Sequence, residues 1–156
     1  MTDAMKQLVT AFIIVTMTTM QSPVVDFALG TTSAYAETKA SNKTYSEEVK
    51  LIARVTEAEA GCEDEYGKRL VIDTILNRVD SDRFPDTVNS VIYQKNQFSV
   101  VSNGTMKSSA DIDICELVEE ELEERTNNEV LFFQQGGYCQ WGEALFKHGS
   151  HYFCGD

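Results

Sequence analysis

The chain has 156 residues, of which 13 are Lys or Arg and 25 are Asp or Glu, so its formal net charge is −12. This length fits one modest domain. The acidic balance argues against nucleic acid as a partner and against electrostatic attachment to an anionic membrane, because both need a basic face. It leaves open a neutral sugar polymer, since such a substrate is bound by hydrogen bonds and stacking.

The first 36 residues have the layout of a secretory signal peptide. An apolar run begins at Leu8, and Ala34-Tyr35-Ala36 fits a cleavage site. The run is too short to span a bilayer. We therefore predict a signal peptide at 1–36, a flexible lead-in at 37–45 and one exported domain at 46–156, with no stable membrane insertion after cleavage. An uncleaved amphipathic anchor or a buried strand is the alternative.

Apolar residues recur at helical spacing in the first half of this domain. They predict a first helix at 46–60, which a capping box of Thr44 and Glu47 would open and Gly61 would end. A second helix is predicted at 63–79.

A short helix at 87–93 is followed by a polar, turn-rich loop at 94–107. A loop of this length in a small domain is more often functional than not. The next helix is predicted at 109–125, where the run of glutamates is a solvated face. Strands are predicted at 129–134 and 151–154. The expected fold class is α+β: a mainly helical single domain with a small C-terminal β-sheet.

All four cysteines follow residue 36. An even number of cysteines in an exported chain predicts disulfides, with three possible full pairings. We favour Cys139–Cys154, which closes a short loop, together with Cys62–Cys115. Four free thiols are the alternative.

His148 and His151 have the spacing H-x-x-H and lie near two cysteines in the sequence. Zinc accepts such ligands. However, no C-x-x-C or H-E-x-x-H accompanies them, and cysteines of an exported chain more often pair with each other. We therefore expect no metal and no cofactor.

Three carboxylates, Glu57, Glu59 and Glu63, gather where the first predicted helix ends. Glu57 and Glu59 are two residues apart, so they point to different faces of the helix. Glu59 stands between two alanines on the flank of the apolar stripe. A carboxyl group in apolar surroundings holds its proton more tightly and can act as a general acid. Glu59 is therefore the candidate acid; a solvated helix-end glutamate is the alternative.

A series of short sequence blocks, spread in order over most of the domain, points to one family. The blocks are Leu51-Ile52-Ala53-Arg54, Ala58-Glu59-Ala60 with Glu63, Ile75-Leu76-Asn77-Arg78-Val79, Arg83-Phe84-Pro85-Asp86-Thr87, Val91-Ile92-Tyr93-Gln94, Gln97-Phe98-Ser99, Leu131-Phe132-Phe133, Trp141-Gly142 and Gly149-Ser150-His151-Tyr152-Phe153. Together they resemble the catalytic domain of the spore cortex-lytic cell wall hydrolase family (the SleB/CwlJ type). No single block is specific enough by itself.

The resemblance implies a peptidoglycan-degrading enzyme with a fold like a compact lysozyme or lytic transglycosylase. The family's catalytic glutamate corresponds to Glu59. We expect it to cleave the glycan strand between N-acetylmuramic acid and N-acetylglucosamine as a lytic transglycosylase, with one catalytic glutamate, in the secreted or cell-wall fraction. The expected substrate-binding residues are Tyr93, Gln97, Phe98, Ser99, Trp141 and His151.

The chain departs from the family at two places. Glu57 stands where the family often has an aromatic residue, and Gly61-Cys62 replaces an Arg-Gly pair. Each expected substrate-binding residue also has a structural alternative, in the core or as a loop cap. Two other functions remain open: a non-catalytic cell-wall-binding module of the same fold, and a zinc-dependent N-acetylmuramoyl-L-alanine amidase.

Overall fold

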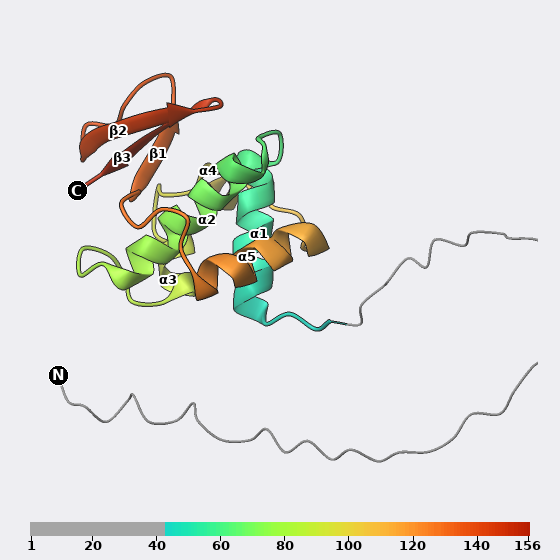
Figure 1. The fold of residues 1–156 in the computed structure, drawn as a ribbon. Helices are drawn as coiled ribbons and strands as arrows, with labels where there is room; N and C mark the ends of the chain where they lie inside the picture. Colours follow the sequence, from blue (N-terminus) through green and yellow to red (C-terminus); the bar gives the residue numbers. More distant parts are fainter. Residues whose placement is uncertain (1–42) are drawn as a thin grey trace, which may run out of the picture. The chain divides into compact units, whose positions relative to one another are not determined.

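The structure, a computed structural model, describes residues 43–156, which belong to one compact unit. The predicted signal peptide and most of the predicted lead-in lie outside the described residues. The elements of the described part are α1 (Glu47–Ala60), α2 (Glu65–Asp80), α3 (Val88–Ile92), α4 (Ser99–Ser102), α5 (Ile112–Glu123), β1 (Phe132–Gln135), β2 (Glu143–His148) and β3 (His151–Gly155) (Figure 1). None of the helices between residues 43 and 156 has the length and apolar character needed to cross a membrane.

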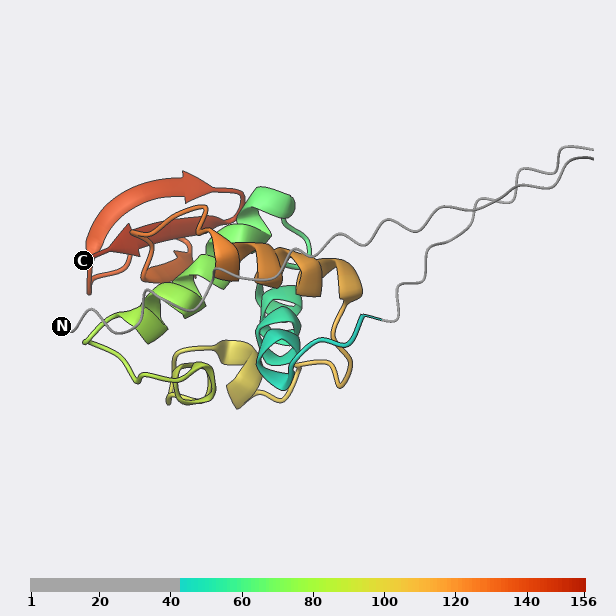
Figure 2. The same cartoon turned by 60° about the horizontal axis from the view of Figure 1, so that its bottom comes forward.

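Helix α1 is the centre of the helical layer and contacts the other four helices. Figure 2 shows α5 crossing α1, with the sheet on the opposite side of the helices from the α3 and α4 region. The side chains of Ile52, Ala53 and Val55 are at most 1% exposed, so the apolar stripe of α1 is fully used in the core. Ser46 caps the helix by accepting a hydrogen bond from the Val49 amide at 3.2 Å. The predicted capping box led by Thr44 is therefore wrong.

Helix α2 is buried over most of its length, because it contacts three helices and β1. Its polar side chains consequently need partners inside the protein. The side-chain amide of Asn77 (Nδ2) donates to the backbone carbonyls of Asn127 and Val130 at 2.8 and 2.9 Å. These bonds tie α2 to the segment that leads into β1.

A buried acid pair joins α2 to the end of α5. Asp73 and Glu121 are both fully buried, so the prediction that the whole run of glutamates is a solvated face is wrong for Glu121. Glu121 accepts hydrogen bonds from Arg69 Nη1 at 2.7 Å and from the Thr126 amide at 2.6 Å, and Asp73 accepts from the Asn127 amide at 2.8 Å. Burial and the hydrogen bond to Glu121 raise the pKa of Asp73 to about 8. Burial also acts to raise the pKa of Glu121, but bonds from Arg69 and Asp73 outweigh it and lower that pKa. Asp73 therefore keeps its proton beside the ionised Glu121 carboxylate.

The C-terminal sheet is antiparallel, in the order β1-β3-β2. Phe153 of the central strand pairs with Phe133 of β1 and with Phe146 of β2, and a register shift lies between Ala144 and Phe146. Phe153 is fully buried, so the sheet presents one apolar face to the helices. The predicted α+β class is confirmed. Both predicted strands are present, whereas β2 and α4 were not predicted.

The predicted disulfides Cys139–Cys154 and Cys62–Cys115 are absent from this structure, in which all four cysteines are free thiols. Cys62 is exposed after the end of α1, whereas Cys115 is buried in the core on α5. Cys139 and Cys154 do lie side by side: the Cys139 amide donates to Cys154 Sγ at 3.3 Å. Burial, and then a hydrogen bond with the Cys139 thiol, raise the pKa of Cys154.

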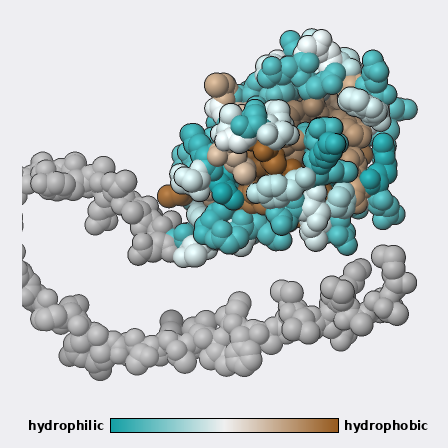
Figure 3. All heavy atoms as spheres, turned by 180° about the vertical axis from the view of Figure 1, so that it is seen from behind, coloured by the Kyte–Doolittle hydropathy of each residue, from teal (hydrophilic) through white to brown (hydrophobic). Residues whose placement is uncertain are grey.

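The surface is polar around a limited apolar area. Figure 3 shows hydrophobic side chains in a hollow on one face of the folded unit, ringed by hydrophilic ones. The buried apolar side chains form two clusters, a large one that spans the helices and a smaller one of Leu70, Val130 and Phe153.

Candidate functional site

Glu59 lies in the last turn of α1 and is half-buried. Its Oε1 lies 3.4 Å from Ser99 Oγ and 3.5 Å from the Val100 amide, both of which donate to it. Ser99 begins α4, which lies inside the loop predicted at 94–107. The loop therefore reaches the candidate acid, and both of its contacts to the carboxylate are long ones that a ligand can replace.

Glu63 follows Glu59 in the chain, but its carboxylate is held differently. Glu63 Oε1 accepts from the Ser150 amide at 3.1 Å and from the Ser150 hydroxyl. These bonds lower the pKa of Glu63, so the group is ionised at neutral pH. Ser150 lies in the turn between β2 and β3. Gly149 beside it has φ +51° and leaves no room for a Cβ, which would collide with Glu63 Oε2. Glu63 thus serves to fasten this turn to the end of α1.

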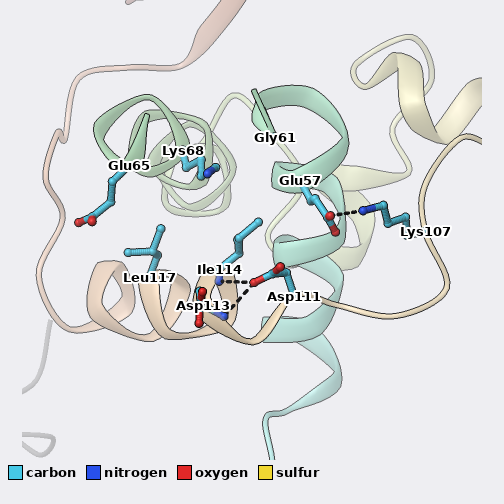
Figure 4. A pocket seen from close by; sticks show the side chains of 9 residues that line it. All are labelled: Glu57, Gly61, Glu65, Lys68, Lys107, Asp111, Asp113, Ile114 and Leu117. Atoms are coloured by element: carbon cyan, nitrogen blue, oxygen red, sulfur yellow. Dashed lines mark hydrogen bonds and ion pairs between the residues drawn. The ribbon is translucent and has the colours of Figure 1, made fainter. Parts of the chain in front are cut away.

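Glu57 faces a different side of α1, as the two-residue spacing predicted. It forms an ion pair with Lys107 in a surface pocket of about 470 Å³ (Figure 4). On the wall of this pocket Asp111 caps α5, accepting from the amides of Asp113 and Ile114. The full lining is Glu57, Gly61, Glu65, Lys68, Lys107, Asp111, Asp113, Ile114 and Leu117. Glu59 is not part of it, so this pocket and the candidate acid are separate sites.

Gln97 and Trp141, two of the predicted substrate-binding residues, meet in a second cavity of about 350 Å³. Its lining is Arg78, Arg83, Phe84, Gln97, Phe132, Phe133, Gln134, Cys139 and Trp141. Gln97 is two residues from Ser99, which contacts Glu59. Tyr93 ends α3 and is 53% exposed, and Trp141 is 70% exposed, so both aromatic faces are open to solvent.

Phe98 and His151 lie inside the protein rather than on a binding surface. They are 1% and 3% exposed. Phe133 joins them, with its ring centre 6.3 Å from that of Phe98 and 5.2 Å from that of His151. His151 Nδ1 also lies 3.7 Å from Glu63 Oε1. These two residues can support the loop and the sheet but offer little surface to a sugar.

Arg78 lines the same cavity as Gln97 and Trp141, and the sequence assigned it no role. It belongs to the block Ile75-Leu76-Asn77-Arg78-Val79, and its side chain is buried on α2. Burial lowers the pKa of Arg78 to about 10, so the group is still a cation near neutral pH.

The two histidines have different partners. His148 Nε2 is 2.7 Å from Asp64 Oδ1, and its ring packs edge-on against Tyr66. His151 instead contacts Phe133 and Glu63. Within residues 43–156, no three His, Cys, Asp or Glu side chains are grouped so as to hold a metal ion.

Comparison with known proteins gives a consistent set of similarities. A family model described as cell wall hydrolase matches residues 62–154, more than half of the chain. A spore cortex-lytic enzyme from Oceanobacillus iheyensis is 28% identical over 113 residues, which cover 69% of this chain and 41% of that protein. The chain thus spans less than half the length of this relative.

Two solved structures are similar to the folded part. The catalytic domain of the Bacillus cereus SleB protein is 28% identical with a TM-score of 0.63, covering 71% of this chain and 92% of that one. The catalytic domain of the germination-specific lytic transglycosylase SleB from Bacillus anthracis is 27% identical with a TM-score of 0.62, covering 70% and 96%. The stretch matched by the family model begins after Glu59, so the assignment of Glu59 depends on its own surroundings.

Proposed function

The chain belongs to the cell wall hydrolase family, and on that premise we propose that it cleaves peptidoglycan glycan strands between N-acetylmuramic acid and N-acetylglucosamine, with Glu59 as the acid. The observation that carries this proposal is the half-buried Glu59 carboxylate at the end of α1, which within residues 43–156 accepts only the long hydrogen bonds from Ser99 and Val100. Peptidoglycan as the substrate is consistent with the family and with the spore cortex-lytic relative.

In the proposed reaction, protonated Glu59 gives its proton to the glycosidic oxygen. The bond to C1 of N-acetylmuramic acid breaks, and the transition state has oxocarbenium character. The Glu59 carboxylate then takes the proton of the 6-hydroxyl group of the same sugar, whose oxygen attacks C1 to close a 1,6-anhydro ring. Because this nucleophile is tethered to the reacting centre, the step needs neither an activated water nor a second carboxylate.

The surroundings of the two carboxylates nearest to Glu59 in the sequence of α1 and its end, Glu57 and Glu63, favour a transglycosylase over a hydrolase. A lysozyme-like hydrolase needs a second carboxylate at a defined separation across the scissile bond. Glu63, the next carboxylate after Glu59, is engaged by Ser150 and anchors the turn between β2 and β3. Glu57 is paired with Lys107 in the separate pocket.

The remaining predicted residues take three roles in this proposal. Ser99 orients Glu59. Gln97, Trp141 and Tyr93 bind sugar rings through an amide and two open aromatic faces. The buried residues Phe98 and His151 act as positioning residues, through Phe133. We further propose that the protein is exported and acts in the cell wall.

The test is product analysis with a matched pair of variants. Purified peptidoglycan is digested, and the soluble muropeptides are identified by mass spectrometry. We expect 1,6-anhydromuramyl ends, with a loss of activity of about 10²–10⁴-fold in Glu59→Gln, which is the range of general acid catalysis. Glu57→Gln, on the other face of the same helix, should retain activity, and both variants should unfold at nearly the wild-type temperature.

Three other outcomes identify the alternatives. Reducing muramic acid ends would make the enzyme a hydrolase. Release of free stem peptides would identify an amidase and reject glycan cleavage. Binding to insoluble peptidoglycan without releasing soluble fragments would identify a non-catalytic binding module. An active Glu59→Gln variant would remove Glu59 from the mechanism.

A further inference from the structure

The cavity of about 350 Å³ that contains Gln97 and Trp141 has an unusual charge for this protein. The whole chain has a formal net charge of −12. The lining of this cavity nevertheless includes two arginines, Arg78 and Arg83, and no Asp or Glu. A cavity with this lining attracts an anion, because its wall carries positive charge and no carboxylate.

Arg78 is a buried cation without an anionic partner among residues 43–156. It is 4% exposed, and its Nε donates to the Leu131 carbonyl at 2.7 Å. Its Nη1 has no hydrogen-bond partner. The guanidinium carbon lies 5.1, 5.3 and 5.4 Å from the centres of three rings, those of Phe84, Phe98 and Phe132. A buried charge is costly unless it is paired, so the unpaired guanidinium is a feature that a ligand can explain.

Arg83 differs from Arg78 although both line the same cavity. The Arg83 side chain is 47% exposed and forms an ion pair with Asp156. Its charge is therefore already compensated and screened by solvent. Arg78 is consequently the cation that an incoming anion would meet unpaired.

The rest of the wall suits a sugar that carries the anion. The indole of Trp141 is 70% exposed and available for stacking. Gln97 and Gln134 supply amide groups, and Gln134 Nε2 donates to the Gly137 carbonyl at 2.9 Å, so its side chain is already oriented. Aromatic faces with a few fixed polar groups are the usual composition of a small-molecule site.

We propose that this cavity is a carboxylate subsite, in which the Arg78 guanidinium binds a carboxylate group of the peptidoglycan while Trp141 packs on the attached sugar or peptide. This inference rests on the proposed function for its substrate class. Two groups of peptidoglycan supply the carboxylate: the lactyl ether of muramic acid in a peptide-free strand, or an acidic residue of the stem peptide. A planar carboxylate matches the fork of donors of an arginine.

The test uses Trp141, the one tryptophan of the chain, as a reporter inside the cavity. Its fluorescence is titrated in the Glu59→Gln protein, so that no turnover occurs and the result does not depend on catalysis. N-acetylmuramic acid carries the lactyl carboxylate, its methyl ester lacks the charge, and N-acetylglucosamine lacks the lactyl group. A muramyl dipeptide has the lactyl group in an amide bond and a carboxylate on the peptide.

We expect saturable binding of at least one carboxylate ligand, about tenfold tighter than that of N-acetylglucosamine, which is the effect of one charge-assisted hydrogen bond. Preference for N-acetylmuramic acid over its methyl ester identifies the lactyl group as the source. Preference for the muramyl dipeptide alone identifies the stem peptide. Equal affinity for all four ligands, or no response to any of them, overturns the subsite.

Two variants assign the binding to Arg78. Arg78→Met keeps an apolar side chain against the three phenylalanine rings but removes the charge. It should lower the ratio of the affinities for the carboxylate ligand and its uncharged counterpart to about one. Arg83→Gln is the matched control. It should change this affinity ratio by less than about twofold, because Arg83 is paired and exposed. A preference that survives Arg78→Met overturns the assignment. If Arg78→Met fails to fold, the comparison of acid and methyl ester in the parent protein still decides whether a carboxylate is bound.

The outcomes for the subsite and for the proposed function are separable. If the digest yields no glycan cleavage but the carboxylate preference depends on Arg78, the proposed function fails and the subsite stands. If the digest yields anhydro ends and Trp141 reports no preference, the function stands and the subsite fails.

Discussion

The buried pair Asp73 and Glu121 predicts how the stability of the protein depends on pH. Asp73 is fully buried, and burial together with the bond to Glu121 raises its pKa from 3.8 to about 8. Between these values the folded state holds a proton that the unfolded state releases. The free energy of unfolding therefore falls as pH rises from about 4 to about 8, by about 1.4 kcal/mol per pH unit for this one group.

The perturbation that isolates this effect is Asp73→Asn. An asparagine cannot titrate, yet its amide can donate to Glu121 and its carbonyl oxygen can accept from the Asn127 amide, as Asp73 does. The substitution should remove this group's contribution to the slope of the unfolding free energy against pH while leaving the fold unchanged. Relative to the wild type, Asp73→Asn should therefore become more stable by about 1.4 kcal/mol for each pH unit between about 5 and about 8.

The measurement is urea denaturation, followed by circular dichroism, at pH 5, 6 and 7. Asp82→Asn is the control, because Asp82 is an exposed aspartate just beyond the same helix. Glu121 does not disturb this window, since its pKa is lowered from 4.5 and its contribution is lost only as pH falls below that value. If the stabilities of Asp73→Asn and wild type run parallel across these pH values, Asp73 is ionised in the folded protein and the reasoning is wrong.

Two further substitutions test contacts that fix the architecture. Arg69→Met should destabilise the fold by about 3–5 kcal/mol, because it leaves the fully buried Glu121 carboxylate without its cation. Urea denaturation at neutral pH measures the change in the free energy of unfolding. A decrease of less than about 1 kcal/mol would show that the ion pair is dispensable. Gly149→Ala should destabilise by about 1.5–3 kcal/mol more than Gly104→Ala. Both glycines have positive φ, but only at position 149 does the added Cβ displace the Glu63 carboxylate, so thermal unfolding of the two variants gives the difference. Equal losses would mean that Glu63 moves aside without cost.

The sequence predicted the two main helices closely, because their apolar residues recur at helical spacing. The predicted ranges 46–60 and 63–79 differ from α1 and α2 by at most two residues at either end. Strand β2 was missed for a physical reason. Its residues are mostly exposed or half-buried, and its pairing with β3 across the Gly149 turn, not an apolar run, defines it. Pairing of this kind depends on tertiary context more than on local propensity.

A part of the candidate site could be predicted where its residues belong to one segment of the sequence. A part formed by several distant segments could not be predicted. Glu59 stood out because its position on a single helix and its sequence block pointed to the same residue. The cavity around Arg78 joins α2, the loop at Gln97 and the sheet with the Trp141 segment, and no spacing in the sequence brings these together. Helix α2 is buried on several sides, so its pattern did not distinguish an arginine that points to solvent from one that is enclosed.

The order β1-β3-β2 also affects how the chain folds as it emerges from a ribosome. β1 and β2 emerge first, yet neither pairs with the other, and each hydrogen-bonds only to β3. Until His151–Gly155 has emerged, both strands have unpaired backbone groups and the apolar face around Phe146 has no cover. The sheet therefore cannot be completed before β3 has emerged. A nascent chain stalled before residue 151 would be a target for proteolysis rather than a partly active enzyme.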